Sequence, residues 1–496
     1  MLGNILNNLD LFTVLTFFFV LLLTYIIWDN FYGIRVNIPG PTPWPIVGNL
    51  PNIVGTKNAA ETFMKLQKKY GNLVFLRLGT RPFVVVFGYK KIREILVENG
   101  NKTKFRPRGG FIKKLFPNDV QGVAVSNGQE WSDIRKFTIV ALKYFGMGKK
   151  SIEERINEEA GFLVDLFYKQ SNKPTDVSKV FSRATSNIIS NIIFGSRFEY
   201  DNPDFNRMLE NVAFIFKHNA LLRPETIFPI LDKILPSSKV KQLIERRHQI
   251  QSYIETRIDE QRKTFDPQNI RNLLDLYLEQ EGHTDAKMSD ERLFLTITDL
   301  YIAGTDTTSV TLQWSMLYML KYPDVQKTCR DQILEVIGDR IPVVKDKDDL
   351  PYVMATLYEV QRIATIAPMG VAHSTMEDIH IDGKIIPKGT DILCSLMSIH
   401  FDPEMWDEPD VFRPERFLGP DGQFLKHEAF SAFSMGPRIC LGKQLAKAEG
   451  FLFFTAILQR FDLIKSEENY DLPTMGIHTG ATLQPQPFKM CFRQRI

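Results

Sequence analysis

The pattern of hydrophobic and polar positions predicts a mainly α-helical chain with a smaller β region, an α+β fold class. Apolar residues recur at helical spacing through the middle of the chain, for example over Ile152 to Tyr168 and Val240 to Lys263. Earlier in the chain, Asn72 to Leu78 and Arg81 to Phe87 have strand character, and Gly79-Thr80 between them indicates a hairpin.

A second strand region and a long helix are predicted towards the C-terminus. The strand pattern returns over Ile379 to Leu393, with a turn at Asp382-Gly383. Ser289 is a suitable N-cap for a helix of about 30 residues that Pro323 would end, and Pro351 favours the start of another helix. No repeat or Pro/Gly/Ser-rich linker divides the chain, so we predict one large domain.

The first thirty residues differ from the rest. Leu11 to Trp28 carries no charge, and as a helix it would span roughly 27 Å, close to the thickness of a bilayer core. We therefore predict a membrane anchor helix over residues 1–30; the alternatives are a cleaved signal peptide and a buried core helix. No Lys or Arg precedes the run, whereas Arg35 and Lys57 follow it, which favours a body that faces the cytoplasm.

A proline-rich hinge is predicted over residues 31–50. Its stretch IPGPTPWPIVGN, Ile38 to Asn49, cannot be helical and favours a stiff, extended conformation. The interleaved Trp44, Ile46 and Val47 predict that this segment packs on another surface and is not a plain linker.

Composition excludes few classes of protein, but the cysteines narrow them. The 496 residues are 44% hydrophobic and 24% charged, and the net charge of +3 gives no reason to propose nucleic-acid binding. The four cysteines form neither a C-x-x-C pair nor a zinc spacing with histidine, so we expect a reducing compartment rather than a disulfide framework. They are Cys329, Cys394, Cys440 and Cys491.

Cys440 lies in the stretch FSMGPRICLG, between two glycines and just before a helical pattern that begins at Leu441. The spacing F-x-x-G-x-R-x-C-x-G fixes five positions that seldom coincide by chance: Phe433, Gly436, Arg438, Cys440 and Gly442. This stretch resembles the haem-binding loop of the cytochrome P-450 family. The alternative, a buried structural cysteine, is our interpretation of the other three cysteines.

The residue types in this loop suit a thiolate ligand of iron. Gly436 and Gly442 would let backbone N–H groups approach the Cys440 sulfur and stabilise its charge. Arg438 offers a cation to a haem propionate, and Phe433 would keep water from the sulfur.

A second motif, AGTDTT, lies inside the long helix. Ala303 and Thr307 are four residues apart on one face, and the small Ala303 and Gly304 would leave room for a flat cofactor and a diatomic ligand. The stretch resembles the oxygen-activation segment of the family, which implies that Asp306 and Thr307 form the acid–alcohol pair that delivers protons. The alternative is a Thr-rich helix kink with a surface Asp.

The third motif is structural. Glu359 and Arg362 are three residues apart on one helix face, and the resemblance places Arg416, of FRPERF, within reach of them. Such a buried group would fix the segment leading to the thiolate loop, and the alternative is a solvated helix pair.

Three further positions match family contacts to the haem acids. Trp131 and Arg135 lie one helical turn apart, and His373 follows the Glu359 helix. For His373 the alternative is an ordinary hydrogen-bonded histidine.

The resemblance covers almost the whole chain and implies a single haem-thiolate catalytic domain over residues 51–496. It implies haem b between the long central helix and the helix after the thiolate loop. The activity it implies is a monooxygenase that inserts one oxygen atom from O2 into a lipophilic small molecule. The catalytic domain would face the cytoplasm, on a single-pass anchor in the endoplasmic reticulum membrane.

No G-x-G-x-x-G fingerprint occurs, so the electrons must come from another chain. The resemblance implies that they come from NADPH through a separate reductase, with cytochrome b5 as a further donor. The expected docking face includes Arg135, Lys136, Lys443 and Lys447. The apolar stretch Leu221 to Pro236 is expected to contact membrane lipid and admit substrate. Two other functions stay open, a reductase-independent haem-thiolate isomerase or dehydratase and a non-catalytic haem-binding protein.

Overall fold

The computed structural model describes residues 11–32, 36–53, 59–79, 81–107, 121–145, 150–218, 238–281, 289–467, 472–473, 476–479 and 482–495. Most of these residues are helical, and the strands form small sheets, so the predicted α+β class is confirmed. Thr80 of the predicted hairpin and residues 221–236 lie outside the described residues.

The helices are α2 Leu11–Tyr32, α3 Ala59–Tyr70, α4 Tyr89–Arg93, α5 Gly100–Thr103, α7 Gly128–Tyr144, α8 Lys150–Lys169, α9 Val177–Phe194, α10 Pro203–His218, α13 Ser238–Lys263, α14 Leu273–Glu281, α15 Asp290–Lys321, α16 Pro323–Val336, α17 Pro351–Ala364, α18 Leu396–His400 and α19 Lys443–Arg460. Four shorter helical turns are η1 Leu50–Asn52, η2 Glu94–Glu98, η3 Val344–Asp348 and η4 Pro414–Phe417. The strands are β1 Leu73–Leu78, β2 Arg81–Val86, β3 His373–Ser374, β4 Ile379–Ile381, β5 Lys384–Ile386, β6 Asp391–Cys394, β7 Phe461–Lys465, β8 Gly476–Thr479, β9 Thr482–Pro485 and β10 Met490–Gln494.

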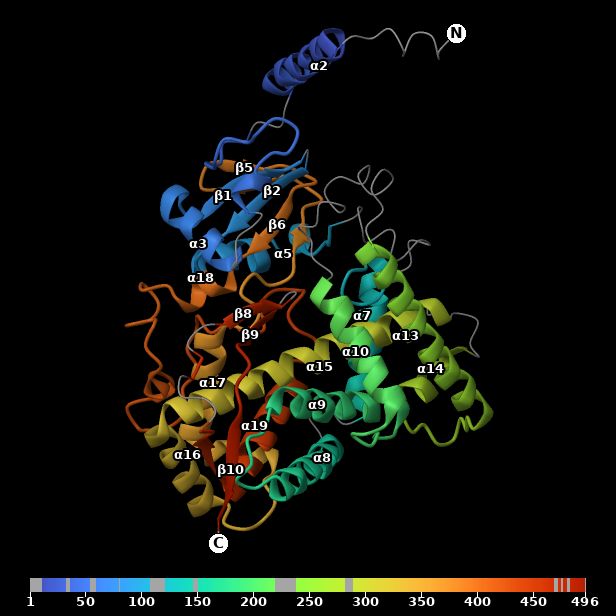
Figure 1. The fold of residues 1–496 in the computed structure, drawn as a ribbon, viewed down its shortest axis with the longest axis vertical. Helices are drawn as coiled ribbons and strands as arrows, with labels where there is room; N and C mark the ends of the chain where they lie inside the picture. The colour runs from blue at the N-terminus through green and yellow to red at the C-terminus, as the bar shows by residue number, and fades with distance from the viewer. Residues whose placement is uncertain are drawn as a thin grey trace.

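The 32-residue helix α15 crosses the middle of the body, and other helices surround it (Figure 1). As predicted, the Ser289 side chain caps its start by accepting from the Arg292 N–H at 3.3 Å. The helix ends at Lys321, and Pro323 begins α16. α15 packs on α9, α17 and α19, so it lies against the helix that follows the thiolate loop.

Close packing of α9 against α15 corrects one expectation. A Cβ atom at Gly304 would lie only 2.5 Å from Ile189 Cδ1 of α9. The bare glycine therefore serves helix–helix contact rather than leaving space for a cofactor. Ala303, the neighbouring residue, is exposed.

The main sheet has the strand order β1-β2-β6-β3 and forms the upper left part of the body in Figure 1. β1 and β2 pair antiparallel, as the predicted hairpin requires, whereas β6 joins β2 in parallel. β4 and β5 form the second predicted hairpin, with Asp382 and Gly383 at φ 50° and 67°. Two positive φ values at the turn match the twist of the paired strands.

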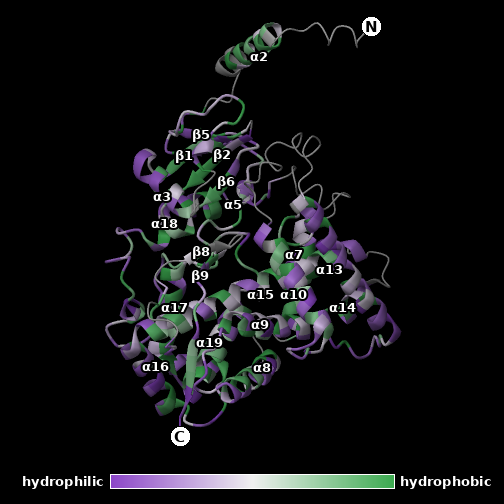
Figure 2. Cartoon of the chain, viewed as in Figure 1, coloured by the Kyte–Doolittle hydropathy of each residue, from purple (hydrophilic) through white to green (hydrophobic). Residues whose placement is uncertain are grey.

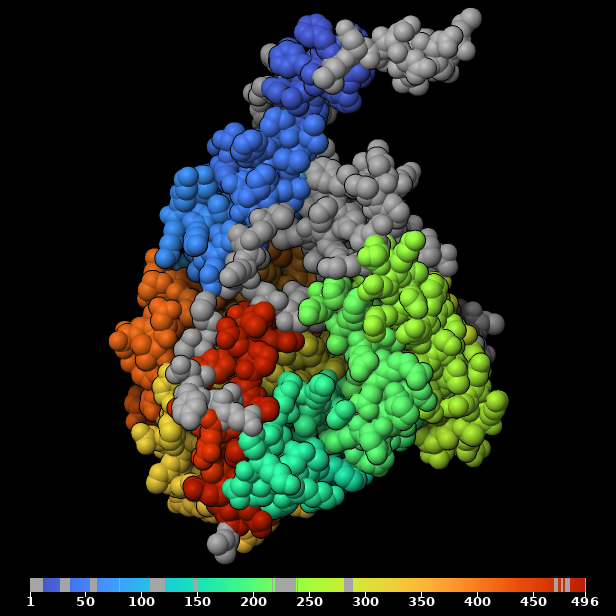
Figure 3. All heavy atoms as spheres, in the orientation of Figure 1, coloured from blue at the N-terminus to red at the C-terminus, as the bar shows by residue number. Residues whose placement is uncertain are grey.

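Helix α2 stands clear of the body (Figure 3) and is mostly hydrophobic (Figure 2). Its apolar side chains are exposed, for example Phe12 at 77% and Phe19 at 65%, so the alternative of a buried core helix is wrong. Among the described residues, however, none of the helices combines the length and apolar character that crossing a membrane requires. The predicted anchor is thus not confirmed.

The proline-rich hinge is attached to β1 through its backbone. The Phe75 N–H donates to Pro39 O at 2.8 Å, and the Asn49 side chain accepts from the Arg77 N–H at 2.7 Å. The segment therefore packs on β1, whereas the side chains of Trp44 and Ile46 are 61% and 51% exposed. They lie in a tight turn whose side chains point outward while its backbone makes the contacts.

Candidate active site

The thiolate loop places Cys440 just before the N-terminus of α19. The Cys440 N–H donates to Phe433 O at 3.1 Å, and Arg135 donates to Ile439 O at 2.9 Å, so both sides of the loop are held. Burial raises the pKa of the Cys440 thiol, whereas the N–H groups of Gly442 and Lys443 and the charge of Arg135 lower it. The residue is nevertheless exposed, as expected of a thiol that protein atoms surround but do not cover.

Gly436 has a different role from the one predicted. Its φ is 76°, and a Cβ atom there would lie 1.8 Å from the Leu96 carbonyl oxygen of η2. The glycine therefore lets the loop approach η2, rather than clearing space around the sulfur. The Gly442 N–H lowers the pKa of the thiol, but an added Cβ at Gly442 would meet nothing within 4 Å, so this contact does not require a glycine.

Arg438 and Trp131 lie together beside the loop. The Arg438 guanidinium donates to Lys104 O at 2.7 Å and Ser126 O at 2.5 Å, and it stacks 4.0 Å from the centre of the Trp131 ring. Trp131 is buried, and its indole N–H has no hydrogen-bond partner among the described residues. An unsatisfied buried donor indicates a missing acceptor.

Arg106 completes this cluster, and the sequence analysis did not single it out as a site residue. Its guanidinium is buried and donates to the carbonyl groups of Val371 and Ala372 at 3.0 and 2.8 Å. No motif marks Arg106 in its stretch of the sequence. Only the fold brings it near Arg438.

The guanidinium groups of Arg106, Arg135 and Arg438 carry positive charge close to one another. Burial, together with Arg135, lowers the pKa of Arg106 to about 10, and burial together with Arg106 and Arg135 lowers that of Arg438 to about 9. Within the described part of the chain, none of them contacts a carboxylate. Buried cations are normally paired, so this cluster fits an anionic ligand such as the propionates of haem.

His373 is next to the cluster but is already engaged. Its Nδ1 lies 2.7 Å from Thr103 O, to which it can only donate. Burial, with Arg106 and Arg438, lowers its pKa to about 3, so the ring is neutral and Nε2 is left as an acceptor. In this state the ordinary hydrogen-bonded histidine describes it better than a donor to a haem acid.

The acid and the alcohol of the central helix point to different partners. Thr307 Oγ1 donates to Ala303 O at 2.6 Å, whereas the Asp306 carboxylate accepts from Thr482 at 2.8 Å and Gln484 at 3.1 Å on β9. Burial raises the pKa of Asp306, and these two hydrogen bonds lower it. The structure thus brings Thr307 to the Ala303 face but ties Asp306 to the neighbouring hairpin.

Asp299 is a second residue that the sequence analysis missed. It lies one turn before Ala303, accepts from the Ala124 N–H at 2.8 Å and has its pKa raised to about 7 by burial. The only signal was one acid in an otherwise apolar stretch of helix.

The predicted structural group is confirmed. Arg362 donates to both oxygens of Glu359 at 2.7 and 2.8 Å, and Arg416 donates to Glu359 at 3.1 Å. Glu359 and Arg362 are fully buried, so the alternative of a solvated helix pair is wrong.

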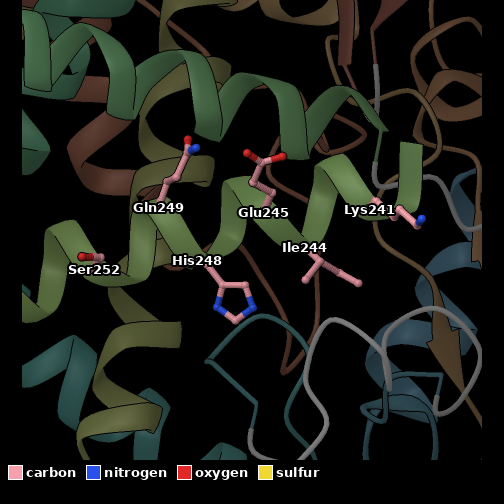
Figure 4. Close-up of a pocket in the computed structure, with 6 residues that line it drawn as sticks. All are labelled: Lys241, Ile244, Glu245, His248, Gln249 and Ser252. Atoms are coloured by element: carbon pink, nitrogen blue, oxygen red, sulfur yellow. The ribbon is translucent and has the colours of Figure 1, made fainter. Parts of the chain in front are cut away.

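Two hollows lie on the surface of the described residues, and one of them borders the thiolate loop. One, of about 550 Å³, is lined by six residues of α13 alone (Figure 4), namely Lys241, Ile244, Glu245, His248, Gln249 and Ser252. Another, of about 190 Å³, lies under the thiolate loop, between Phe433 and Lys443 on one side and Arg93 on the other.

The fold and this arrangement define a haem-thiolate protein. The Cytochrome P450 family model matches residues 38–492. Cytochrome P450 2D26 of Rattus norvegicus is 37% identical over 97% of this chain and 98% of its own length. Cytochrome P450 2G1 of Oryctolagus cuniculus is 38% identical over 90% of this chain and 91% of its own. The chain belongs to the cytochrome P-450 family; it is a cytochrome P-450 monooxygenase, and its cofactor is haem b.

We predict that Gly436→Ala disrupts the thiolate loop. The new Cβ would collide with a backbone oxygen that cannot turn away, so we expect a loss of more than about 4 kcal/mol in the free energy of unfolding. Gly422→Ala is the matched control, because its φ is 75° but nothing lies within 4 Å. It should cost only about 1–2 kcal/mol. Equal losses in chemical denaturation would contradict the steric explanation.

Proposed function

We propose that the Cys440 sulfur would bind the haem iron in this monooxygenase. The observation that carries the proposal is an exposed thiol at the start of α19, with backbone N–H groups and Arg135 directed at it. A thiolate needs such donors, because desolvation alone keeps the thiol protonated. When bound, haem supplies the one-electron chemistry and the activation of O2 that side chains lack.

The acidic groups of haem would be held by the buried cation cluster. Trp131 offers an unpartnered N–H, and Arg135, Arg438 and Arg106 offer charge without competing carboxylates in the described residues. Ala303 gives α15 a small, exposed surface on the face it shares with Thr307. Phe433 and Gly436 shape the loop on the sulfur side. His373 would contribute only after taking up a proton or giving up Thr103.

We infer that Thr307 and Asp306 supply protons to the reaction. The Thr307 hydroxyl can exchange its bond to Ala303 O for one to a water or to the reacting oxygen. Asp306 would act as the internal acid, since burial favours its protonated form. Its bonds to Thr482 and Gln484 require that β9 release the carboxyl group before a proton passes to Thr307.

The reaction is proposed to be insertion of one oxygen atom from O2 into a lipophilic small molecule. Electrons would come from NADPH through a separate cytochrome P-450 reductase, with cytochrome b5 as a further donor. Burial and mutual repulsion lower the pKa values of Lys426 and Lys443, which is the signature of crowded positive charge beside the loop. With Arg135, Lys136 and Lys447, these residues suit an acidic flavoprotein surface.

We also propose that residues 1–30 anchor the enzyme in the endoplasmic reticulum membrane, with the catalytic domain in the cytoplasm. The support is the exposure of the apolar side chains of α2 away from the body. Exposed apolar surface of this extent is unfavourable in water and is typical of a membrane contact.

We predict that Cys440→Ser abolishes the thiolate-type absorption spectrum of the ferrous carbon monoxide complex, because an alcohol oxygen is a poorer charge donor to iron. Cys491→Ser is the control, since that cysteine lies in β10, far along the chain from the loop. An unchanged spectrum in Cys440→Ser would overturn the ligand assignment.

Thr307→Ala should keep the haem spectrum but reduce product formed per O2 consumed by about tenfold or more, with a matching rise in hydrogen peroxide. Thr311→Ala, one turn along the same helix, is the control and should stay coupled. NADPH consumption in both variants would separate a monooxygenase from an isomerase or dehydratase, which needs no reductant. Full coupling in Thr307→Ala would show that its hydroxyl does not move protons.

Removal of residues 1–30 should transfer the expressed protein from the membrane to the soluble fraction without changing its haem spectrum. Partition after high-salt and after detergent washing measures this. If the shortened protein stays with the membrane through the salt wash, another segment is the principal contact.

A further inference from the structure

His400 is the last residue of α18 and lies between the buried Glu359–Arg362 pair and the segment that leads into the thiolate loop. Both nitrogens of its ring have hydrogen-bond partners. Its imidazole is fully buried. Nε2 lies 3.0 Å from the backbone nitrogen of Ser431, and Nδ1 lies 2.9 Å from Thr365 Oγ1. Neither the sequence motifs nor the proposed reaction uses this residue.

The partners of the ring fix its tautomer. The Ser431 N–H can only donate, so Nε2 must be the unprotonated nitrogen. The Thr365 hydroxyl already donates its hydrogen to Arg362 O, so Nδ1 must carry a hydrogen and donate to Thr365. A directional chain therefore runs from Ser431 through the ring of His400 and the hydroxyl of Thr365 to α17.

The backbone of His400 also contacts the buried pair, because its carbonyl oxygen accepts a hydrogen bond from Arg362. Arg362 donates to the His400 carbonyl oxygen at 2.7 Å, in addition to its two bonds to Glu359. The position of His400 is thus set by a pair of fully buried charges. Burial and the neighbouring Arg362 hold the pKa of the ring down to about 3, so its hydrogen-bonding pattern does not change at neutral pH.

At the Ser431 end, this series of hydrogen bonds continues to the backbone of Cys440. Ser431 accepts from the Ser434 N–H at 2.9 Å, and the intervening Phe433 accepts from the Cys440 N–H at 3.1 Å. A displacement of the Ser431 backbone would therefore reach Cys440 through two further backbone hydrogen bonds. The Ser431 side chain is not needed, because it bonds Ala429 O instead.

We propose that His400 is a positioning residue that sets the register of the thiolate loop against the Glu359–Arg362 pair and thereby tunes the iron–sulfur bond. The proposal rests on the assignment of Cys440 as the iron ligand. On this proposal the buried pair influences the haem through the hydrogen bonds of His400, in addition to stabilising the fold.

The test compares His400→Phe, His400→Gln and Thr365→Val in the full-length holoenzyme. In His400→Phe the Ser431 N–H loses its acceptor, so amide exchange over residues 429–434 should become about tenfold faster or more. The reduction potential should shift, and a larger fraction of the ferrous carbon monoxide complex should lose the thiolate-type spectrum. His400→Gln can still present an oxygen to Ser431 and should be affected less.

Thr365→Val should change the potential in the same direction, because it leaves Nδ1–H without its acceptor. The His400→Phe/Thr365→Val double variant should be no more affected than His400→Phe alone, since the hydroxyl acts through the ring. Two controls separate this route from general packing. Ser431→Ala keeps the N–H, and His427→Phe removes another loop histidine, whose Nδ1 accepts from the Ala429 N–H at 3.1 Å; both should retain the wild-type potential.

Thermal unfolding of each variant separates positioning from stability. A His400→Phe protein that is less stable but has wild-type exchange, potential and spectrum would overturn the proposal. If His400→Phe does not fold, His400→Gln and Thr365→Val decide by the same readouts. A wild-type protein without a thiolate-type spectrum would instead refute the assignment of Cys440, so the two failures are distinguishable.

Discussion

The rest of the structure depends on how the thiolate loop holds Cys440, because opposing influences set the pKa of its thiol. Burial favours the neutral thiol of Cys440, and the opposing forces are short-range donors, namely the N–H groups at the start of α19 and the Arg135 guanidinium. Such donors act only when the loop is held to within a fraction of an ångström. The neighbouring elements hold the loop in this way. The backbone of η2 leaves no room for a side chain at Gly436, and Arg135 donates a hydrogen bond to the carbonyl oxygen of Ile439, just before the cysteine.

Two kinds of buried charge surround this loop, and the protein treats them differently. Glu359 and Arg362 neutralise each other fully and serve the framework. Arg106 and Arg438 donate to backbone carbonyl oxygens and contact no carboxylate in the described part of the chain, and burial together with the nearby Arg135 lowers their pKa values. The paired charges of Glu359 and Arg362 hold segments of the fold together. The cations of Arg106 and Arg438 fit a ligand that carries negative charge.

Local patterns predicted most of the framework and the chemically distinctive residues. The cap at Ser289 and the loop around Cys440 depend on neighbours in sequence, so their signals are strong. The misses share another cause. The roles of Gly304 and Gly436 depend on Ile189 and Leu96, which are remote in sequence, and Arg106 joins the cation cluster only through the fold. When the role of a residue depends on a contact with a residue remote in sequence, the local sequence pattern cannot predict that role.

The contact between Gly304 and Ile189 has a consequence for how this scaffold varies. A Cβ atom at Gly304 of α15 would need the space that the Ile189 side chain of α9 occupies. The combined side-chain volume at these two positions is therefore limited. A chain that carries alanine at the first position must give up a comparable amount of side chain at the second, or separate α9 from α15. The two sites should therefore change together during divergence, although neither touches the chemistry.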